Sequence, residues 1–300
     1  MPRKKSTSWD NRKLKDIVIP VMGATGAGKS TFINTLLGYE RMTVGHDLTS
    51  CTSKLQEVAL DFPSGSHLEG YRLVVVDTPG FDDTYEGDAA ILRRVAEWLE
   101  KSYRGKDVLG GVIYLHDISH DRFTGVARRN LEMFRAMCGS AAINKVVLGT
   151  TCWTRTSPEI GLRHEEEIER LHWSPLLKQG ARMRQFQGTP ESALGFIEDI
   201  VKRNSNHQLT DTVLQIQTEL ADDGKILPET EAGKHLHGTL QEVLKAQKEM
   251  AVLEASMASE GDPDAKAKLE ETRAKIENLV RQVQELKIPL SRRLRSFFGL

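Results

Sequence analysis

Apolar and polar positions follow one another in short blocks along the first two thirds of the chain, and their period changes repeatedly. The block "DIVIPVMG", residues 16–23, is a short apolar run that ends in glycine, which predicts a buried strand. Apolar residues then recur at three- and four-residue steps over 30–37, which predicts a helix that stops at Gly38. The blocks 54–62 and 71–80, separated by a turn-rich segment, favour two further strands.

The same alternation continues to about residue 203. Strand patterns cover 107–119, 143–153 and 181–188, whereas helical patterns cover 89–103, 126–139, the start of 165–180, and 192–203. Strands that alternate with helices predict an α/β fold, with a mostly parallel sheet covered by helices on both faces. In such sheets ligands bind at the carboxyl ends of the strands.

After about residue 205 the helical period dominates. Two stretches, 236–257 and 265–287, carry apolar residues at three- and four-residue steps on either side of the breaker "SEGDPD". They predict an antiparallel helical hairpin or coiled coil. The expected organisation is a basic, disordered N-terminus over 1–15, a P-loop domain over 16–205, and a helical extension over 206–300.

The composition is that of an ordinary soluble globular protein, with 39% hydrophobic and 28% charged residues. A net charge of -1, without a basic half, gives no reason to expect a nucleic-acid partner. No apolar run approaches the roughly 18 residues of a membrane-spanning helix, and the three cysteines lack metal-binding spacing. We therefore expect a cytoplasmic protein. The C-terminal "SRRLRSFFGL" is expected to pack on the helices rather than to bind a membrane.

The segment "VMGATGAGKSTFINTLLG" has the spacing G-x-x-x-x-G-K-S between a strand and a helix. Glycines let backbone amides cradle a phosphate, and the N-terminus of the following helix favours the negative charge. Lys29 would reach the β- and γ-phosphates, and the Ser30 hydroxyl would bind Mg²⁺. The predicted nucleotide-binding residues of this loop are Gly23, Ala24, Thr25, Gly26, Ala27, Gly28, Lys29, Ser30 and Thr31.

A second motif, "VVVDTPG", ends the second apolar strand after the glycine loop. Asp77 would hold Mg²⁺ and the Gly80 amide would contact the γ-phosphate. The intervening loop "LTSCTSK" offers Thr52, or else Thr49, as a further Mg²⁺ and γ-phosphate ligand. Lys29, Thr52 and Gly80 are thus the predicted catalytic groups, and Ser30, Thr52 and Asp77 the predicted metal ligands.

Phe81 follows Gly80 at the position where Ras-type sites use a glutamine to orient water, which predicts slow hydrolysis. A group from a mobile loop or from a partner would then complete the site, and Arg41, His46 and Arg122 are unranked candidates. His116 and Asp117, at the end of a predicted strand, could line a dimer face or form a surface turn.

Base recognition is predicted in "TTCWTR", after a later strand. Thr151 would take the first position of the guanine-reading motif N/T-K-x-D, and Thr154 stands where the acid is expected. Since threonine lacks a carboxylate, guanine discrimination should be weaker. Trp153 would either stack on the base or pack in the interior. Ser192 and Ala193, in "TPESA", are placed for the loop that closes over the base. The earlier "NKVV" lies at the wrong end of its strand.

With these motifs in order, the chain resembles fungal G-domain proteins of the septin and immunity-associated (GIMAP-like) branch of the translation-factor-type GTPases. The resemblance rests on "GATGAGKSTFIN", "DTPGFDDT", "VVLGTTCW" and "GTPESA", and covers roughly residues 15–255. It implies a Ras-like sheet, GTP or GDP with Mg²⁺, and a homodimer through the G domain. Members of this branch commonly carry "TTxWD", so Thr154 is a departure.

The predicted function is a guanine-nucleotide switch with slow, Mg²⁺-dependent GTP hydrolysis, regulated by dimerisation or a partner. An effector would bind the helical tail. The alternatives are an ATP-using or base-indifferent P-loop NTPase, and a scaffold that binds nucleotide without hydrolysing it.

Overall fold

The computed structural model describes residues 15–42, 55–61, 71–81, 87–204, 213–259 and 263–292. Within these ranges seven strands form one sheet in the order β2-β3-β1-β5-β6-β7, and β4 pairs with β1. The strands are β1 (Lys15–Gly23), β2 (Gln56–Asp61), β3 (Tyr71–Asp77), β4 (Val108–Leu109), β5 (Val112–Asp117), β6 (Val146–Thr151) and β7 (Arg182–Gln185). Only β2 runs antiparallel to its neighbour, β3. The predicted mostly parallel sheet is confirmed.

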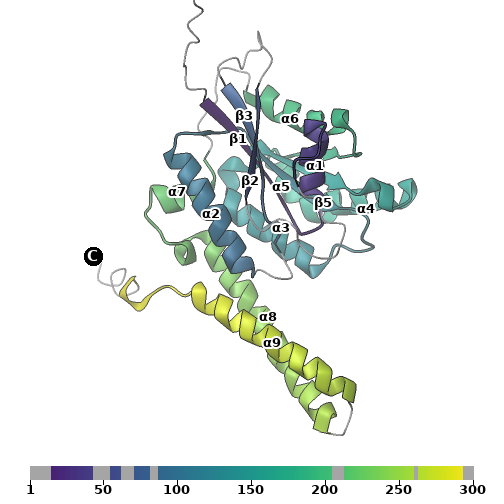
Figure 1. Ribbon diagram of the computed structural model, residues 1–300, viewed down its shortest axis with the longest axis vertical. Helices are drawn as coiled ribbons and strands as arrows, with labels where there is room; N and C mark the ends of the chain where they lie inside the picture. The colour runs from purple at the N-terminus through teal and green to yellow at the C-terminus, as the bar shows by residue number, and fades with distance from the viewer. Residues whose placement is uncertain are drawn as a thin grey trace, which may run out of the picture.

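Helices cover both faces of this sheet, as predicted (Figure 1). The helices are α1 (Lys29–Leu37), α2 (Asp88–Arg104), α3 (Gly125–Cys138), α4 (Pro158–Ile168), α5 (Ser174–Lys178), α6 (Pro190–Asn204), α7 (Gln215–Ala221), α8 (Glu231–Ser259) and α9 (Pro263–Glu285). Buried residues of α1 and α6 share one apolar core with β1, β3 and β5. Those of α2, α3 and α7 share a second core on the opposite face.

Two predicted elements are divided in the structure. The apolar block 107–119 forms β4 and β5, which are separated by Gly110 and Gly111. The segment 165–180 is not one regular helix, because a π-helical turn, Glu169–Trp173, separates α4 from α5. This turn buries the Trp173 side chain completely in the second core. Here tertiary packing overrides the local helical period.

The first part of the helical extension packs against the α/β domain. Leu214, Ile216, Leu236 and Leu240 all lie in the second core, so α7 and the first half of α8 pack against the α/β domain. The second half of α8 and α9 then form a hairpin that projects away from it (Figure 1). The predicted hairpin is therefore present, whereas the predicted boundary near 205 falls outside the described residues.

None of the helices in the described ranges combines the length and the apolar character that crossing a lipid bilayer requires. Residues 293–300, which carry the end of the basic and aromatic tail, lie outside the described part of the chain.

Candidate functional site

The glycine loop lies at the carboxyl end of β1, where β1 ends at Gly23 and α1 begins at Lys29. Gly28, the residue before the helix, has φ 82° in the left-handed region, which favours glycine because other residues are strained there. The turn directs the N-terminus of α1 into the loop. Backbone amides and the helix N-terminus thus form a concave site for an anion.

The Lys29 side chain folds back over this loop and is almost fully buried. Its Nζ donates hydrogen bonds to the carbonyl oxygens of Ala24 (2.8 Å) and Gly23 (3.2 Å). A buried ammonium group needs such acceptors or a negatively charged partner. The loop therefore holds one positive charge directly beside its own amide groups, which is the arrangement that a bound polyphosphate requires.

Ser30 and Asp77 meet beneath the loop. The Ser30 hydroxyl donates a 2.6 Å hydrogen bond to Asp77 Oδ2. Asp77 is completely buried, and its other oxygen, Oδ1, has no hydrogen-bond partner among the described residues. Burial raises the pKa of the Asp77 carboxyl, although the Ser30 hydrogen bond and the charge of Lys29 oppose this.

This pair fits a hard divalent cation. Magnesium prefers oxygen ligands, and it is usually held by one or two protein groups together with water and phosphate oxygens. A buried carboxylate oxygen without a partner is rare and calls for an explanation such as an ion. Ser30 and Asp77, predicted as metal ligands from regions 47 positions apart, are brought into direct contact.

The "DTPG" segment closes against the glycine loop. The Thr25 amide donates to the carbonyl oxygen of Phe81 (3.2 Å), and the Thr25 hydroxyl donates to that of Gly80 (3.4 Å). A Cβ atom at Gly80 would lie 2.4 Å from the Thr25 amide nitrogen, so only glycine allows this approach. Gly80 is therefore held beside the loop, as predicted for a residue that contacts a γ-phosphate.

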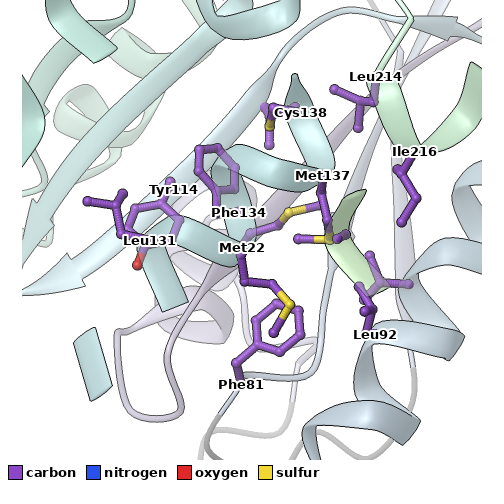
Figure 2. Close-up of a cluster of buried hydrophobic side chains, with 14 of the residues drawn as sticks. Met22, Phe81, Leu92, Tyr114, Leu131, Phe134, Met137, Cys138, Leu214 and Ile216 are labelled. Carbon is purple, nitrogen blue, oxygen red and sulfur yellow. The ribbon is translucent and has the colours of Figure 1, made fainter. Parts of the chain in front are cut away.

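Phe81 points away from the loop into the core. Its side chain is buried, and Figure 2 shows it beside Met22 in the cluster on the second face of the sheet. The position predicted to lack a water-orienting group is thus occupied by a side chain that anchors the segment.

The far side of the loop is joined to the end of β6 by Thr151. Its buried hydroxyl lies 3.0 Å from the carbonyl oxygen of Ala27 and 3.2 Å from that of His116. These contacts use the only hydroxyl proton that Thr151 has. Thr151 therefore links the phosphate loop to the end of β6, and its part in base recognition stays a prediction.

Trp153 is half-buried and makes packing contacts, while stacking on a base stays a prediction. Its Nε1 donates to the carbonyl oxygen and the hydroxyl of Thr150, both at 3.2 Å. Its ring lies against Gly161 of α4, where a Cβ atom would come within 2.9 Å of Cζ3. Thr154, at the position expected for the acid, is exposed to solvent.

Ser192 and Ala193 lie in the first turn of α6, where both donate hydrogen bonds. The Ser192 hydroxyl donates to the Thr189 carbonyl oxygen at 2.7 Å, and the Ala193 amide donates to the same atom at 3.1 Å. The Ala193 side chain is fully buried in the first core. Both residues cap and pack the first turn of α6, and their place in the loop that closes over a base stays a prediction.

His116 and Asp117, predicted for a dimer face or a surface turn, are buried. The His116 ring packs against Phe123 and Trp173, and burial lowers its pKa to about 4. Asp117 accepts a hydrogen bond from the Ser119 amide and lies 3.5 Å from Arg155. Neither side chain is available to a second subunit, because three-dimensional packing covers both.

The remaining candidate residues fall into an exposed group and a group outside the described ranges. Arg41 and Arg122 are exposed and accessible to a partner. Thr49, Thr52 and His46 lie outside the described residues.

Sequence reasoning missed Glu165 of α4, which accepts a 2.8 Å hydrogen bond from the Thr150 hydroxyl and another from the Gln185 side chain. This carboxylate ties α4 to the ends of β6 and β7, beside the loop predicted to read the base. Its place within a glutamate-rich helical block, "HEEEIER", gives no sign of that role.

Residues 16–157 match the AIG1 family. This region includes the glycine loop, Asp77, Gly80 and Thr151. The family match supports the GIMAP-like part of the resemblance drawn from the motifs. It gives no support to a fungal origin or to a septin relationship.

One curated relative is the tRNA modification GTPase MnmE of Chlorobium chlorochromatii, 37% identical over 110 residues. The alignment covers 36% of this chain and 20% of MnmE, so the chain spans about a fifth of that relative's length.

Two solved structures of Toc33 from Arabidopsis thaliana share the fold with a TM-score of 0.51 each. A dimerization-deficient arginine-to-alanine variant is 11% identical and covers 67% of this chain and 88% of Toc33. A complex with GDP and Mg²⁺ is 12% identical and covers 68% and 88%. At these identities the likeness establishes the fold, which is that of Ras-like GTPases.

Proposed function

We propose that this protein is a guanine-nucleotide-binding switch with slow, Mg²⁺-dependent GTP hydrolysis. The observation that carries the proposal is the contact of Ser30 with Asp77 beneath the loop that Lys29 crosses. It brings a hydroxyl, a buried carboxylate and an ammonium group to the amide-lined turn at the end of β1. These are the groups that P-loop NTPases use for phosphate and metal.

Each residue of the site would have a separate role in binding the nucleotide or the metal. Lys29 would leave its two carbonyl acceptors to reach the β- and γ-phosphates, while the loop amides bind the phosphate oxygens. Ser30 and Asp77, together with Thr52, would hold the Mg²⁺. When bound, the ion neutralises charge that develops on the phosphates during transfer. The Gly80 amide, held against Thr25, would contact the γ-phosphate.

Slow hydrolysis follows from Phe81. Its buried ring offers no hydrogen bond to an attacking water, and the core holds it in place. A group from elsewhere would have to supply that function. Arg122, which is exposed at the start of the segment before α3, is a candidate from a second subunit. A dimerization-deficient arginine variant of Toc33 makes an arginine-dependent dimer a reasonable comparison.

Guanine is the proposed base because the relatives with named activities or ligands are a GTPase and a GDP complex. Thr154 supplies no carboxylate for the guanine edge, which keeps the ATP-using or base-indifferent NTPase as an alternative. The buried Phe81 keeps the non-hydrolysing scaffold as the other. In each case an effector on the helical extension and a cytoplasmic location remain part of the proposal.

The deciding experiment is calorimetric titration of the nucleotide-free protein with GTP, GDP and ATP in the presence of Mg²⁺. Binding of guanine nucleotides alone supports the switch, and comparable ATP binding supports the base-indifferent NTPase. Lys29→Ala should abolish binding, whereas the matched change Lys202→Ala, on the exposed face of α6, should leave it intact. No binding by the wild-type protein would contradict all three interpretations of the loop.

A further inference from the structure

The outer half of α8 carries two apolar stripes, and α9 covers only one of them. The covered stripe consists of small residues: Ala251, Ala255 and Ala258 pack with Ala265 and Leu269 of α9. Small side chains let the two helices approach closely. This contact is complete within one chain.

The second stripe is exposed at four of its five positions, and the fifth, Val243, is half-buried. Val243, Ala246, Met250, Leu253 and Met257 follow one another at steps of three, four, three and four residues. These steps are the a and d positions of two heptads, the spacing at which a second helix packs knobs into holes. Met250, Leu253 and Met257 are 49%, 64% and 52% exposed. Single exposed apolar residues are ordinary, but a run at this spacing indicates an interface.

We propose that four of these residues, Ala246, Met250, Leu253 and Met257, form an α8 seam that pairs with the α8 seam of a second copy of the chain in antiparallel orientation. The two-fold axis lies between residues 251 and 252. Met250 then faces Leu253 of the second copy, and Ala246 faces Met257 of the second copy. Each layer combines a and d positions, and one of them pairs a small with a large side chain, which favours close packing.

The length of the free part of α8 agrees with this register. Leu240 is the last α8 residue buried in the core of the α/β domain. The last residue of the second copy's helix, Ser259, would lie opposite Leu244, one helical turn beyond Leu240. The overlap thus spans the projecting part of the hairpin and ends at Leu244, which packs against the edge of that core (Figure 1).

The flanking charges favour the antiparallel direction. A parallel, in-register pair would place Glu249 of one copy next to Glu254 of the other, and such like-charge pairs destabilise coiled coils. In the antiparallel register Glu249 is level with Glu254 of the second copy, but the two lie on opposite flanks of the seam, and the residue beside Glu249 on its own flank is Ser256. The seam of one chain is therefore complementary to itself in one direction only.

This contact goes beyond the proposed nucleotide switch and is separate from a dimer through the nucleotide-binding domain. The hairpin projects away from the α/β domain, so the two α/β domains would lie at opposite ends of the pair. Dimerisation through the seam should therefore be the same without nucleotide and with GDP.

The first test is sedimentation velocity of the full chain, without nucleotide, over a range of concentrations. We expect a monomer–dimer equilibrium that Leu253→Glu weakens by at least about tenfold, because it places a charge in the central layer. The matched control Ala267→Glu introduces the same charge at an exposed position of α9 and should have no effect. A wild-type monomer at all concentrations, or a dimer unaffected by Leu253→Glu, would overturn the proposal.

The second test distinguishes the direction of pairing. Met250→Lys and Leu253→Glu should each be monomeric, but a mixture of the two should form a dimer. In the antiparallel register the new lysine faces the new glutamate, and the second central layer keeps Met250 and Leu253. A parallel pair would gain no such contact, so a mixture that stays monomeric would contradict the register. Unchanged thermal unfolding of each variant would show that the exposed substitutions leave the fold intact.

Discussion

The side-chain oxygen of Gln282 in α9 accepts a hydrogen bond from the backbone amide of Ala89 in α2, although the two residues are 193 positions apart. The Gln282 side chain also lies directly against Gly87, where a Cβ atom would come within 2.3 Å. Ala89 belongs to the first turn of α2, the first helix after the "DTPG" motif. The C-terminal hairpin therefore caps the helix that follows the "DTPG" motif.

Gln282→Ala should destabilise this docking by about 1 kcal/mol, since it removes a buried cap of a helix N-terminus. Chemical denaturation measures the change in the free energy of unfolding, and hydrogen exchange of the Ala89 amide should become faster. Gln284→Ala, an exposed neighbour on α9, is the matched control and should alter neither. Equal hydrogen-exchange protection of the Ala89 amide in both variants would show that the Gln282 hydrogen bond does not stabilise this contact.

Asp77→Asn should stabilise the nucleotide-free protein by about 1 kcal/mol near neutral pH while it abolishes Mg²⁺-dependent nucleotide binding. Burial raises the folded-state pKa of Asp77, so the folded protein binds this proton more tightly than the unfolded chain. Stability therefore falls as pH rises through the interval above the model-peptide value of 3.8. The advantage of the asparagine variant should accordingly shrink as pH falls toward that value.

Two further variants test this account of Asp77. Ser30→Ala keeps the buried charge but removes its 2.6 Å hydrogen bond, so it should destabilise the protein. Asp121→Asn, at an exposed position, should change stability little. Melting temperatures of the four proteins between pH 4 and pH 8 provide the comparison. A destabilised Asp77→Asn variant at neutral pH would contradict the burial argument.

Phe81→Gln should fail to create a faster GTPase, although it restores the residue type that Ras-like sites use. The Phe81 side chain is 4% exposed and packed in the core, so the substitution should cost about 3 kcal/mol of stability. Phe81→Leu, which keeps the position apolar, should cost about 1 kcal/mol. Urea denaturation and single-turnover hydrolysis measure the two effects. Faster hydrolysis by a fully stable Phe81→Gln variant would show that the segment is not anchored as described.

The parts of the site that lie on contiguous motifs were predictable from the sequence. The glycine loop needs only local backbone geometry, and Asp77 follows from its place at the end of a strand adjacent to β1. The structure brings Ser30 and Asp77 into contact, and their role as metal ligands stays a prediction. The contact of Thr151 with the Ala27 carbonyl oxygen could not be predicted in this way, because it depends on how β6 meets the loop.

Contacts that join distant segments could not be predicted in the same way. The burial of His116 depends on Phe123 and on Trp173, which a π-helical turn places in the core. The helical period of α8 revealed its apolar positions, but it could not show that α9 covers the alanines and leaves Met250 and Leu253 open. Periodicity identifies an apolar stripe, whereas only the packed structure identifies its partner.

His116 should give the ligand-free protein a pH-dependent stability. Burial lowers its folded-state pKa from 6.5 to about 4, so the neutral form is favoured in the folded protein. The resulting stability is fully present above pH 6.5 and is lost as pH falls toward 4, by about 3 kcal/mol at most. His116→Phe should flatten this part of the pH profile, whereas His120→Gln, at an exposed position, should not. Urea denaturation at half-unit intervals from pH 4 to pH 8 measures the free energy of unfolding at each pH. If this free energy changes equally with pH in the wild type and both variants, another group controls acid unfolding.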